Sequence, residues 1–232
     1  MAKFGKRTTA ARAAFAGKSA MAVEAALTLI KSSASAKFDE TLEIAMNLGV
    51  DPRHADQMVR GVVTLPHGTG KDVRVLALVT PDKEAEAKEA GADHIGLDEY
   101  LQKIKDGWTD IDVIVTMPSV MGKLGPLGRI LGPRGLMPNP KTGTVSDDTA
   151  HAVNESKAGR VEFRADKGGA AHMPLGKVSF EIPKLVENAE TAINAIIKAR
   201  PAATKGNYVL SCTISATMSP GVKIDLKDIL KV

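Results

Sequence analysis

The chain has 232 residues, enough for one large domain or for two smaller domains with hydrophobic cores. Hydrophobic residues make up 44% and charged residues 25%, which excludes a disordered or fibrous protein, and the single cysteine excludes a disulfide framework or a multi-thiolate metal site. The net charge of +4 suits a polyanionic partner, whereas 3% aromatic residues argue against a general single-strand-binding protein that stacks many bases.

The N-terminal region is basic and has no membrane segment. The first 23 residues contain no acidic side chain and five basic ones: Lys3, Lys6, Arg7, Arg12 and Lys18. A transit peptide has this composition, but so does a basic arm for a polyanion, which we favour. The apolar stretch 20–30 contains Glu24 and is too short to span a bilayer, so we expect a cytoplasmic protein.

Periodicity over the first 66 residues predicts one helix and two strands. Residues 21–30 have helical spacing, whereas 38–48 alternate, with Glu40 as the only interruption. Asp51-Pro52 is typical of a helix start, and 61–66 reads as a further strand. The apolar face of the long strand contains Phe38, Leu42, Ile44, Met46 and Leu48.

The middle of the chain has a different pattern. The apolar runs 73–80 and 111–117 predict strands covered on both faces. Helices are expected over 82–91, 97–107 and 146–159, and a glycine- and proline-rich loop over 118–143. This order is typical of a Rossmann-like layered sheet.

Alternation returns in the last part. Strands are predicted over 160–166 and 177–182, joined by a turn-rich connection, followed by a helix over 183–200 and a strand over 208–218. One face of the last strand contains Tyr208, Leu210, Cys212, Ile214, Ala216 and Met218, and the other contains Ser211, Thr213, Ser215 and Thr217.

Charge divides the chain in the same way. Residues 68–158 contain 11 basic and 14 acidic side chains, whereas the two flanking segments together contain 20 basic and 13 acidic ones. We therefore expect an acidic domain inserted into a basic one, with the polyanion site on the basic domain.

No catalytic constellation is evident, and neither a cofactor nor a metal is predicted. The segment HGTGKD at 67–72 does not match a phosphate-binding loop, because Leu65 stands where the Walker motif has glycine and Asp72 where it has a hydroxyl residue. It does not match the dinucleotide fingerprint either, because Val73 stands in place of the third glycine. We therefore interpret it as a turn between domains. The five histidines are scattered: His54, His67, His94, His151 and His172. Cys212 is expected in the core.

The segment 121–144 carries four cations and no acidic residue: Lys123, Arg129, Arg134 and Lys141. Glycine and proline in such a loop favour a stiff display of these charges. Within it, LGRILGPRGLMPNPKTGTV at 127–145 resembles the signature of the bacterial L-one family of large-subunit ribosomal proteins. Further resemblances are KRTTAA at 6–11, AKFDET at 36–41, GVDPRHADQMVRGVVTLPHGTGK at 49–71, RVEFRADKGGAAHMPLGK at 160–177 and ATMSPGVKID at 216–225.

The resemblance implies an α/β (α+β) protein with a split two-layer RNA-binding domain, residues 1–67 and 159–232, and an inserted Rossmann-like three-layer domain, residues 68–158. It also implies a ribosomal protein of the mobile stalk, monomeric when free. The implied partners are large-subunit ribosomal RNA, exit-site tRNA during its release, and the messenger of its own operon, whose translation it represses.

Transferred residue by residue, the implied RNA surface consists of Glu24, Lys37, Phe38, Thr41, Arg164, Asp166, Lys167, His172, Thr217, Met218, Ser219 and Gly221. Cations in this set suit phosphates, and its hydroxyls suit ribose 2′-hydroxyls. Burial is the alternative for Phe38 and Met218, which share faces with core residues. The loop cations imply tRNA proximity or a domain contact. The rival function is a nucleotide- or phosphate-binding enzyme that uses the inserted domain.

Overall fold

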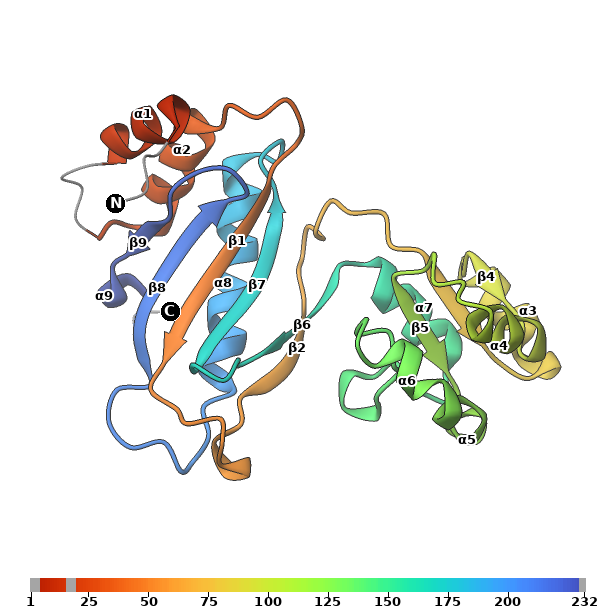
Figure 1. Cartoon of the computed structure of the whole chain (residues 1–232). Helices are drawn as coiled ribbons and strands as arrows, with labels where there is room; N and C mark the ends of the chain where they lie inside the picture. The colour runs from red at the N-terminus through yellow and green to blue at the C-terminus, as the bar shows by residue number, and fades with distance from the viewer. Residues whose placement is uncertain (1–4, 16–19, 230–232) are drawn as a thin grey trace. The chain divides into compact units, whose positions relative to one another are not determined.

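The computed structural model describes residues 5–15 and 20–229, and the chain divides into two compact units. Unit 1 consists of Met1–Gly70 and Val161–Val232, and unit 2 of Lys71–Arg160 (Figure 1). The sequence analysis places these boundaries after residues 67 and 158. Lys3 and Lys18 of the basic arm lie outside the described residues, and no described helix is long and apolar enough to cross a membrane.

The main sheet of unit 1 is antiparallel, with strand order β7-β1-β8-β9. The strands are β1 (Thr41–Leu48), β7 (Ala170–Lys177), β8 (Val209–Ala216) and β9 (Val222–Ile224), and a second sheet pairs β2 (Arg60–Thr64) with β6 (Arg160–Arg164). The helices are α1 (Lys6–Phe15), α2 (Val23–Ser33), α8 (Ile182–Lys198) and α9 (Leu226–Ile229), with a 3₁₀ turn at Ala55–Gln57.

In the described part of the chain, helices cover one face of this sheet and leave the other uncovered. The apolar stripe of α8, including Leu185, Ala189 and Ile193, packs with the inward side chains of β1 in one core, and α2 contacts α8, β8 and β9. In β1 the side chains of Leu42, Ile44, Met46 and Leu48 are buried, whereas Glu43 and Asn47 are exposed. In Figure 1, α8 lies behind the sheet and the uncovered face is turned to the viewer. The predicted alternation over 41–48 is confirmed.

The strand predicted over 177–182 is wrong. The strand is β7, residues 170–177, and the helix α8 begins at Ile182. In β7 the buried side chains of Ala171 and Met173 do alternate, but Pro174 and Gly176 are residues typical of a turn. Both residues are tolerated because β7 is an edge strand with a register shift beside Leu42 and Glu43 of β1.

Three side chains that share an apolar strand face in the sequence pattern are exposed, so the alternative of burial for Phe38 and Met218 is wrong. Leu210 is 50% exposed because the register shifts between Asn47 and Leu48 of β1, which leaves it as an extra residue in β8. Phe38 (55% exposed) and Met218 (50% exposed) lie beyond the ends of β1 and β8, where alternation no longer applies. Cys212 is buried, as predicted, and burial raises the pKa of its thiol to about 12.

Unit 2 is a three-layer α/β unit with a parallel sheet in the order β4-β3-β5. Its strands are β3 (Val75–Leu78), β4 (His94–Ile95) and β5 (Val113–Thr116), and its main helices are α3 (Glu84–Glu89), α4 (Asp98–Lys105) and α7 (Thr149–Lys157), with a 3₁₀ turn at Pro81–Lys83. Every residue of β3 is buried, because Leu76 and Leu78 face one core while Val75 and Ala77 face another.

The glycine-rich segment is not the open loop that was predicted. It forms consecutive short helical turns: Pro118–Val120, α5 (Met121–Leu124), Gly125–Leu127, α6 (Gly128–Leu131) and Pro140–Thr142. Leu124, Leu127, Leu131 and Leu136 are buried in the core of unit 2. Their spacing of three to five residues is the helical signal that the glycines and prolines obscured.

Candidate RNA interface

The uncovered face of unit 1 is lined by hydroxyls. Ser211, Thr213 and Ser215 alternate along β8, are half-buried, and make no hydroxyl hydrogen bond within the described part of the chain. Thr213 lies opposite Ala45 of β1, in the row that continues to His172 of β7. We call this surface the open face. Sequence reasoning noted the alternation of these three hydroxyls but missed them as site residues.

At one end of the open face, a buried carboxylate joins two of the predicted segments. Glu40 is 2% exposed, and its two oxygens accept hydrogen bonds from the backbone N–H of Ala36 (3.2 Å) and of Met218 (2.9 Å). It therefore holds the loop of Lys37 and Phe38 against the end of β8. The interruption of the apolar pattern at Glu40 was the sequence signal for this residue, which the predicted site omitted.

Thr41 and Thr217 meet at the same end. The Thr217 hydroxyl accepts from the Thr41 N–H (3.1 Å) and donates to the Thr41 carbonyl (3.3 Å), so its proton is used within the protein. The Thr41 hydroxyl accepts from Lys177 Nζ at 2.8 Å and keeps its own proton free. Ser219 Oγ accepts from the Ala216 N–H and closes the turn after β8.

Gly221 lies against the open face. A Cβ at this position would come within 2.7 Å of Cγ2 of Thr213. A side chain here would therefore cover the neighbouring hydroxyl row, which explains why glycine keeps this part of the face accessible.

Asp166 closes the turn at the opposite end of the open face. Its Oδ1 accepts from the backbone N–H of Gly168 (2.8 Å) and Ala170 (2.9 Å), which closes the turn into β7 and holds the pKa of the carboxyl below its ordinary value. Oδ2 lies 4.0 Å from Nε2 of His172. His172 is in strand β7, not in the turn-rich connection predicted, and it is exposed on the open face.

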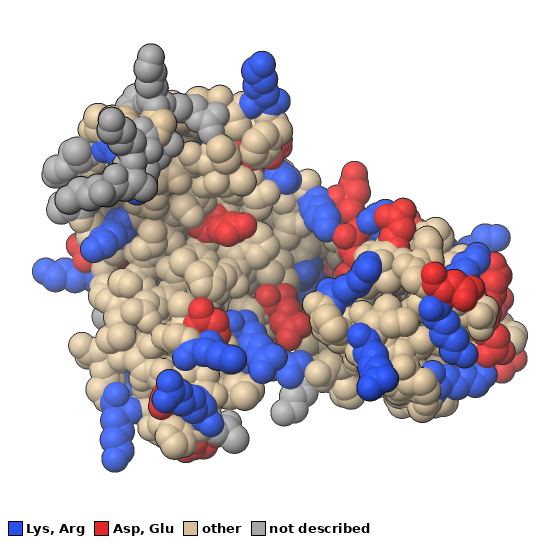
Figure 2. Space-filling view, viewed as in Figure 1, with Lys and Arg blue, Asp and Glu red and all other residues tan. Residues whose placement is uncertain are grey.

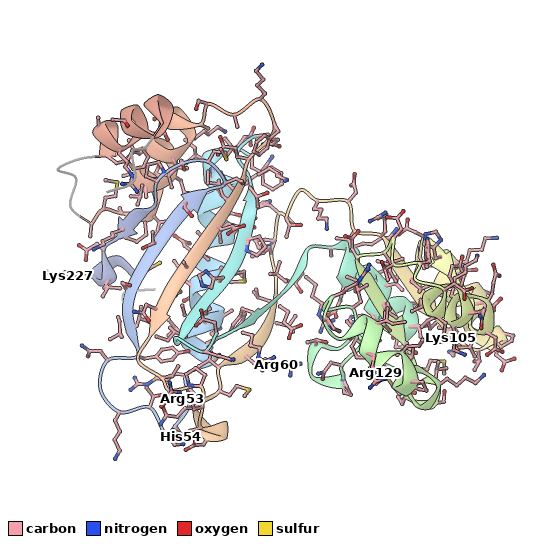
Figure 3. The ribbon with its side chains drawn as sticks, in the orientation of Figure 1. Arg53, His54, Arg60, Lys105, Arg129 and Lys227 are labelled. Carbon is pink, nitrogen blue, oxygen red and sulfur yellow. The ribbon has the colours of Figure 1, made fainter. Side chains whose placement is uncertain are left out.

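Arg164 and Lys167 line a groove of about 660 Å³ beside this turn, together with Arg53 and Met58. Arg53 and Met58 were missed because they follow β1 by several residues and share no periodicity with β6. Figure 3 shows Arg53, His54 and Arg60 at this end of unit 1, and Figure 2 shows Lys and Arg gathered there, whereas most of the open face is uncharged.

The structure thus brings the predicted residues to two ends of one surface. Thr41 and Asn47 are six residues apart on β1, about 20 Å at the rise of a strand. Lys37, Phe38, Thr41, Thr217 and Met218 lie at the first end, Arg164, Asp166 and Lys167 lie at the second, and His172 lies between them.

Glu24 is not brought together with the others. It lies in the first turn of α2, whose residues Ala26, Leu27 and Ile30 pack into the core behind the sheet. Its side chain is exposed and lines a shallow groove along α2. The helical spacing that buries the stripe turns Glu24 away from the open face.

The cations of the glycine-rich segment are only partly displayed. Lys123, Arg129 and Arg134 are all exposed, but Lys123 binds Asp98 (3.0 Å) and Arg134 donates to the Thr109 hydroxyl. The side chain of Lys141 lies outside the described residues.

The hydroxyls of the open face and the cations beside its second end are groups that suit the riboses and phosphates of a polyanion. Among the described residues, no group of three or more His, Cys, Asp or Glu side chains could hold a metal ion. The only described cysteine is buried, which removes it as a nucleophile.

Comparison with known proteins gives one consistent result. The family model for the "Ribosomal protein L1p/L10e family" matches residues 29–220. A protein of Flavobacterium johnsoniae named large ribosomal subunit protein uL1 is 62% identical over 98% of this chain and 99% of its own length. Proteins with the same name from Porphyromonas gingivalis (56% identical, 99% of both chains) and Bacteroides fragilis (58% identical, 94% of this chain and 93% of its own) are also similar.

Proposed function

Because the chain belongs to the ribosomal protein L1p/L10e family, we propose that unit 1 binds large-subunit ribosomal RNA through its open face. The chain is a structural component of the large ribosomal subunit, and the family is not enzymatic. The resemblance given by 127–145 is therefore confirmed, and the enzyme alternative is wrong. As part of the ribosome, the protein belongs to the cytoplasm.

The observation that carries the proposal is a row of hydroxyls on the open face with cations in the groove at its second end. Ser211, Thr213 and Ser215 have no protein partner among the described residues, so each can bond to a ribose 2′-hydroxyl or a phosphate oxygen. Arg164 and Lys167 at the second end supply the charge that neutralises phosphates. The main sheet presents the hydroxyls, and the turn that Asp166 closes, with the end of β6, places the two cations beside them.

We further propose, on the resemblance alone, that the protein assists release of tRNA from the exit site and represses translation of its own operon by binding the messenger. A messenger that folds like the ribosomal site would compete for the same open face. Arg129 is exposed and is not engaged in a side-chain bond like those of Lys123 and Arg134, so we assign it the tRNA contact.

The direct test is a titration of the full chain against a folded large-subunit stalk RNA at several salt concentrations. Lys167→Ala should lower the slope of log affinity against log salt by about one unit, because one phosphate contact is lost. Thr213→Ala and Thr217→Ala should weaken binding with little change in the slope. Lys184→Ala and Thr28→Ala are matched controls on the helices behind the sheet and should change neither quantity.

The proposal is overturned if the controls weaken binding as much as the open-face variants do, or if Lys167→Ala and Thr213→Ala give the same slope. Competition by an operon-leader RNA tests the repressor role separately.

A further inference from the structure

Unit 2 gathers its aromatic side chains in one place. Residues 71–160 contain only two of the chain's Phe, Tyr and Trp residues, Tyr100 and Trp108, and both pack against His94. Ring centroids are 5.6 Å apart for Tyr100 and Trp108, 5.2 Å for His94 and Trp108, and 5.7 Å for His94 and Tyr100. None of the three side chains is fully buried.

The three rings line a pocket of about 410 Å³ that is open to solvent, and Lys103 and Asp106 complete its wall. We call it the aromatic pocket. Both charged residues are exposed, so the pocket combines ring faces with one cation and one carboxylate. The core behind the pocket is rich in leucine. Packing of the rings against that core does not require a cation and a carboxylate at the pocket wall.

The pocket is held by the end of helix α4. Gly107 (φ +97°) ends the helix, its N–H donates to the Ile104 carbonyl, and the Trp108 N–H donates to the Lys103 carbonyl at 3.0 Å. These bonds fix Trp108 relative to Lys103. On the other side, Gly96 (φ +144°) allows a close approach to the Tyr100 ring. The site is therefore preorganised, which lowers the cost of binding.

The charges select the ligand. Lys103 Nζ lies over one face of the Tyr100 ring, 4.6 Å from its centroid, and pairs with Glu99, so the pocket already holds a cation that would repel a cationic ligand. A planar ring that carries an anionic group fits instead, because the ring can stack while the anion faces Lys103.

The carboxylate of Asp106 favours one nucleobase over the others. Asp106 Oδ1 accepts one hydrogen bond, from Gln102 Nε2 at 3.3 Å, and the second oxygen remains for a ligand. A carboxylate can accept both N1–H and N2–H of guanine, whereas adenine, cytosine and uracil each place an acceptor next to their donor on this edge.

We propose that the aromatic pocket of unit 2 binds an unpaired guanine nucleotide, with its base stacked on the rings, its Watson–Crick edge on Asp106 and its phosphate near Lys103. This site is separate from the open face of unit 1 and does not depend on the proposed function. The nucleotide is either free or part of an RNA strand, and the chemistry of recognition is the same.

Trp108 provides the measurement, because it is the only tryptophan of the chain. The full-length protein is titrated with guanosine, adenosine, cytidine and uridine monophosphates and with ribose 5-phosphate, and Trp108 fluorescence is followed. We expect saturable quenching that is tightest for the guanosine nucleotide and absent for ribose 5-phosphate. A single-stranded guanine-containing hexanucleotide and the same strand in a duplex then distinguish the two sources, and only the unpaired strand should bind.

Three variants test the assigned roles. Tyr100→Leu should weaken guanosine monophosphate binding about tenfold through lost stacking. Asp106→Asn should reduce affinity for the guanosine nucleotide to that for the adenosine nucleotide. Lys103→Ala should weaken all nucleotides by a similar factor of about three. Lys105→Ala is the control and should have no effect, because Lys105 (labelled in Figure 3) is on the same helix but does not line the pocket.

The proposal is overturned if the guanosine nucleotide produces no saturable change, if ribose 5-phosphate gives the same change, or if Asp106→Asn keeps the preference for guanine. Asp106 and Lys103 are exposed, so these variants remain informative if Tyr100→Leu fails to fold. Ribosomal RNA binding by the same variants should be unchanged at the open face, which separates failure here from failure of the proposed function.

Discussion

The two sheets of the molecule differ in how many of their faces are covered. In unit 1, helices pack on one face, and the strands alternate between buried apolar and accessible polar side chains. In unit 2, helices pack on both faces, and Val75–Leu78 of β3 is buried without interruption. The difference decides where each unit can bind a partner: unit 1 has a whole sheet face, whereas unit 2 has only its loops and helix ends.

The largest expected effect comes from substituting an alanine on a central strand of each sheet. Ala77 is fully buried in β3 between Ile95 and Val115, whereas Ala45 of β1 lies on the open face between His172 and Thr213. Ala77→Asn should lower the free energy of unfolding of unit 2 by about 3 kcal/mol through overpacking and an unsatisfied amide. Ala45→Asn should cost less than about 0.5 kcal/mol.

Urea unfolding measures both, with Trp108 fluorescence for unit 2 and hydrogen exchange of α8 amides for unit 1. Equal losses for the two variants would show that the sheet of unit 1 has no open face.

A second effect concerns a buried side-chain amide that joins segments of unit 1. Asn188 of α8 is fully buried; its side chain accepts from the His67 N–H (3.1 Å) and donates to the carbonyls of Gly68 (3.0 Å) and Leu175 (2.8 Å). Asn188→Ala should destabilise unit 1 by about 2 kcal/mol, because it leaves three backbone groups without their partner.

The exposed Asn154 of α7 in unit 2 is the matched control, and Asn154→Ala should change stability by less than about 0.5 kcal/mol. Hydrogen exchange of the 67–68 and 175 amides locates the change. A loss seen instead in Trp108 fluorescence would contradict the assignment of this network to unit 1.

A smaller effect is the loss of stability of unit 2 at acid pH, which depends on Asp112. Hydrogen bonds from Lys71 and Arg74 lower the pKa of Asp112 from 3.8 to about 2. Because the folded pKa lies below the unfolded one, the contribution to the stability of unit 2 is complete above about pH 4 and is lost as the pH falls towards 2. Partial exposure reduces it to about 1 kcal/mol.

Asp112→Asn should therefore destabilise unit 2 at pH 6 and become neutral near pH 2, as followed by Trp108 fluorescence in urea. Asp110→Asn is the control: Asp110 is 71% exposed and pairs only with Arg74, so it should matter little at either pH. A pH-independent difference for Asp112→Asn would contradict the ionic origin.

Sequence periodicity predicted the elements whose side chains follow one rule along their length. The alternation of Leu42 to Leu48 and the apolar run of β3 identified a half-covered and a fully covered strand, and the stripe of α8 was evident from its spacing. Periodicity could not identify Arg53 and Glu40 as site residues. A loop brings Arg53 to the groove beside the Asp166 turn, and Glu40 acts from a buried position by bonding to the backbone of Ala36 and Met218.

The errors occurred where local composition and tertiary context disagree. Pro174 and Gly176 concealed β7 because edge position and a register shift tolerate residues that a central strand excludes. The glycine-rich segment concealed its buried leucines for a similar reason, since only packing against the sheet stabilises such short helical turns.

The smallest expected effect tests the remaining error, the place of Leu210. Alternation assigns it to the buried face with Ile214, but the register shift at Leu48 exposes half of its surface. Leu210→Thr should therefore change the stability of unit 1 by less than about 0.5 kcal/mol, whereas Ile214→Thr, fully buried on the same strand, should cost about 2–3 kcal/mol. If both variants lose stability equally in urea unfolding followed by circular dichroism, β8 has no extra residue at this position. The strand would then alternate without interruption to its start, with Leu210 buried beside Cys212 and Val209 on the open face, so this small difference in stability checks the geometry at this end of the RNA surface.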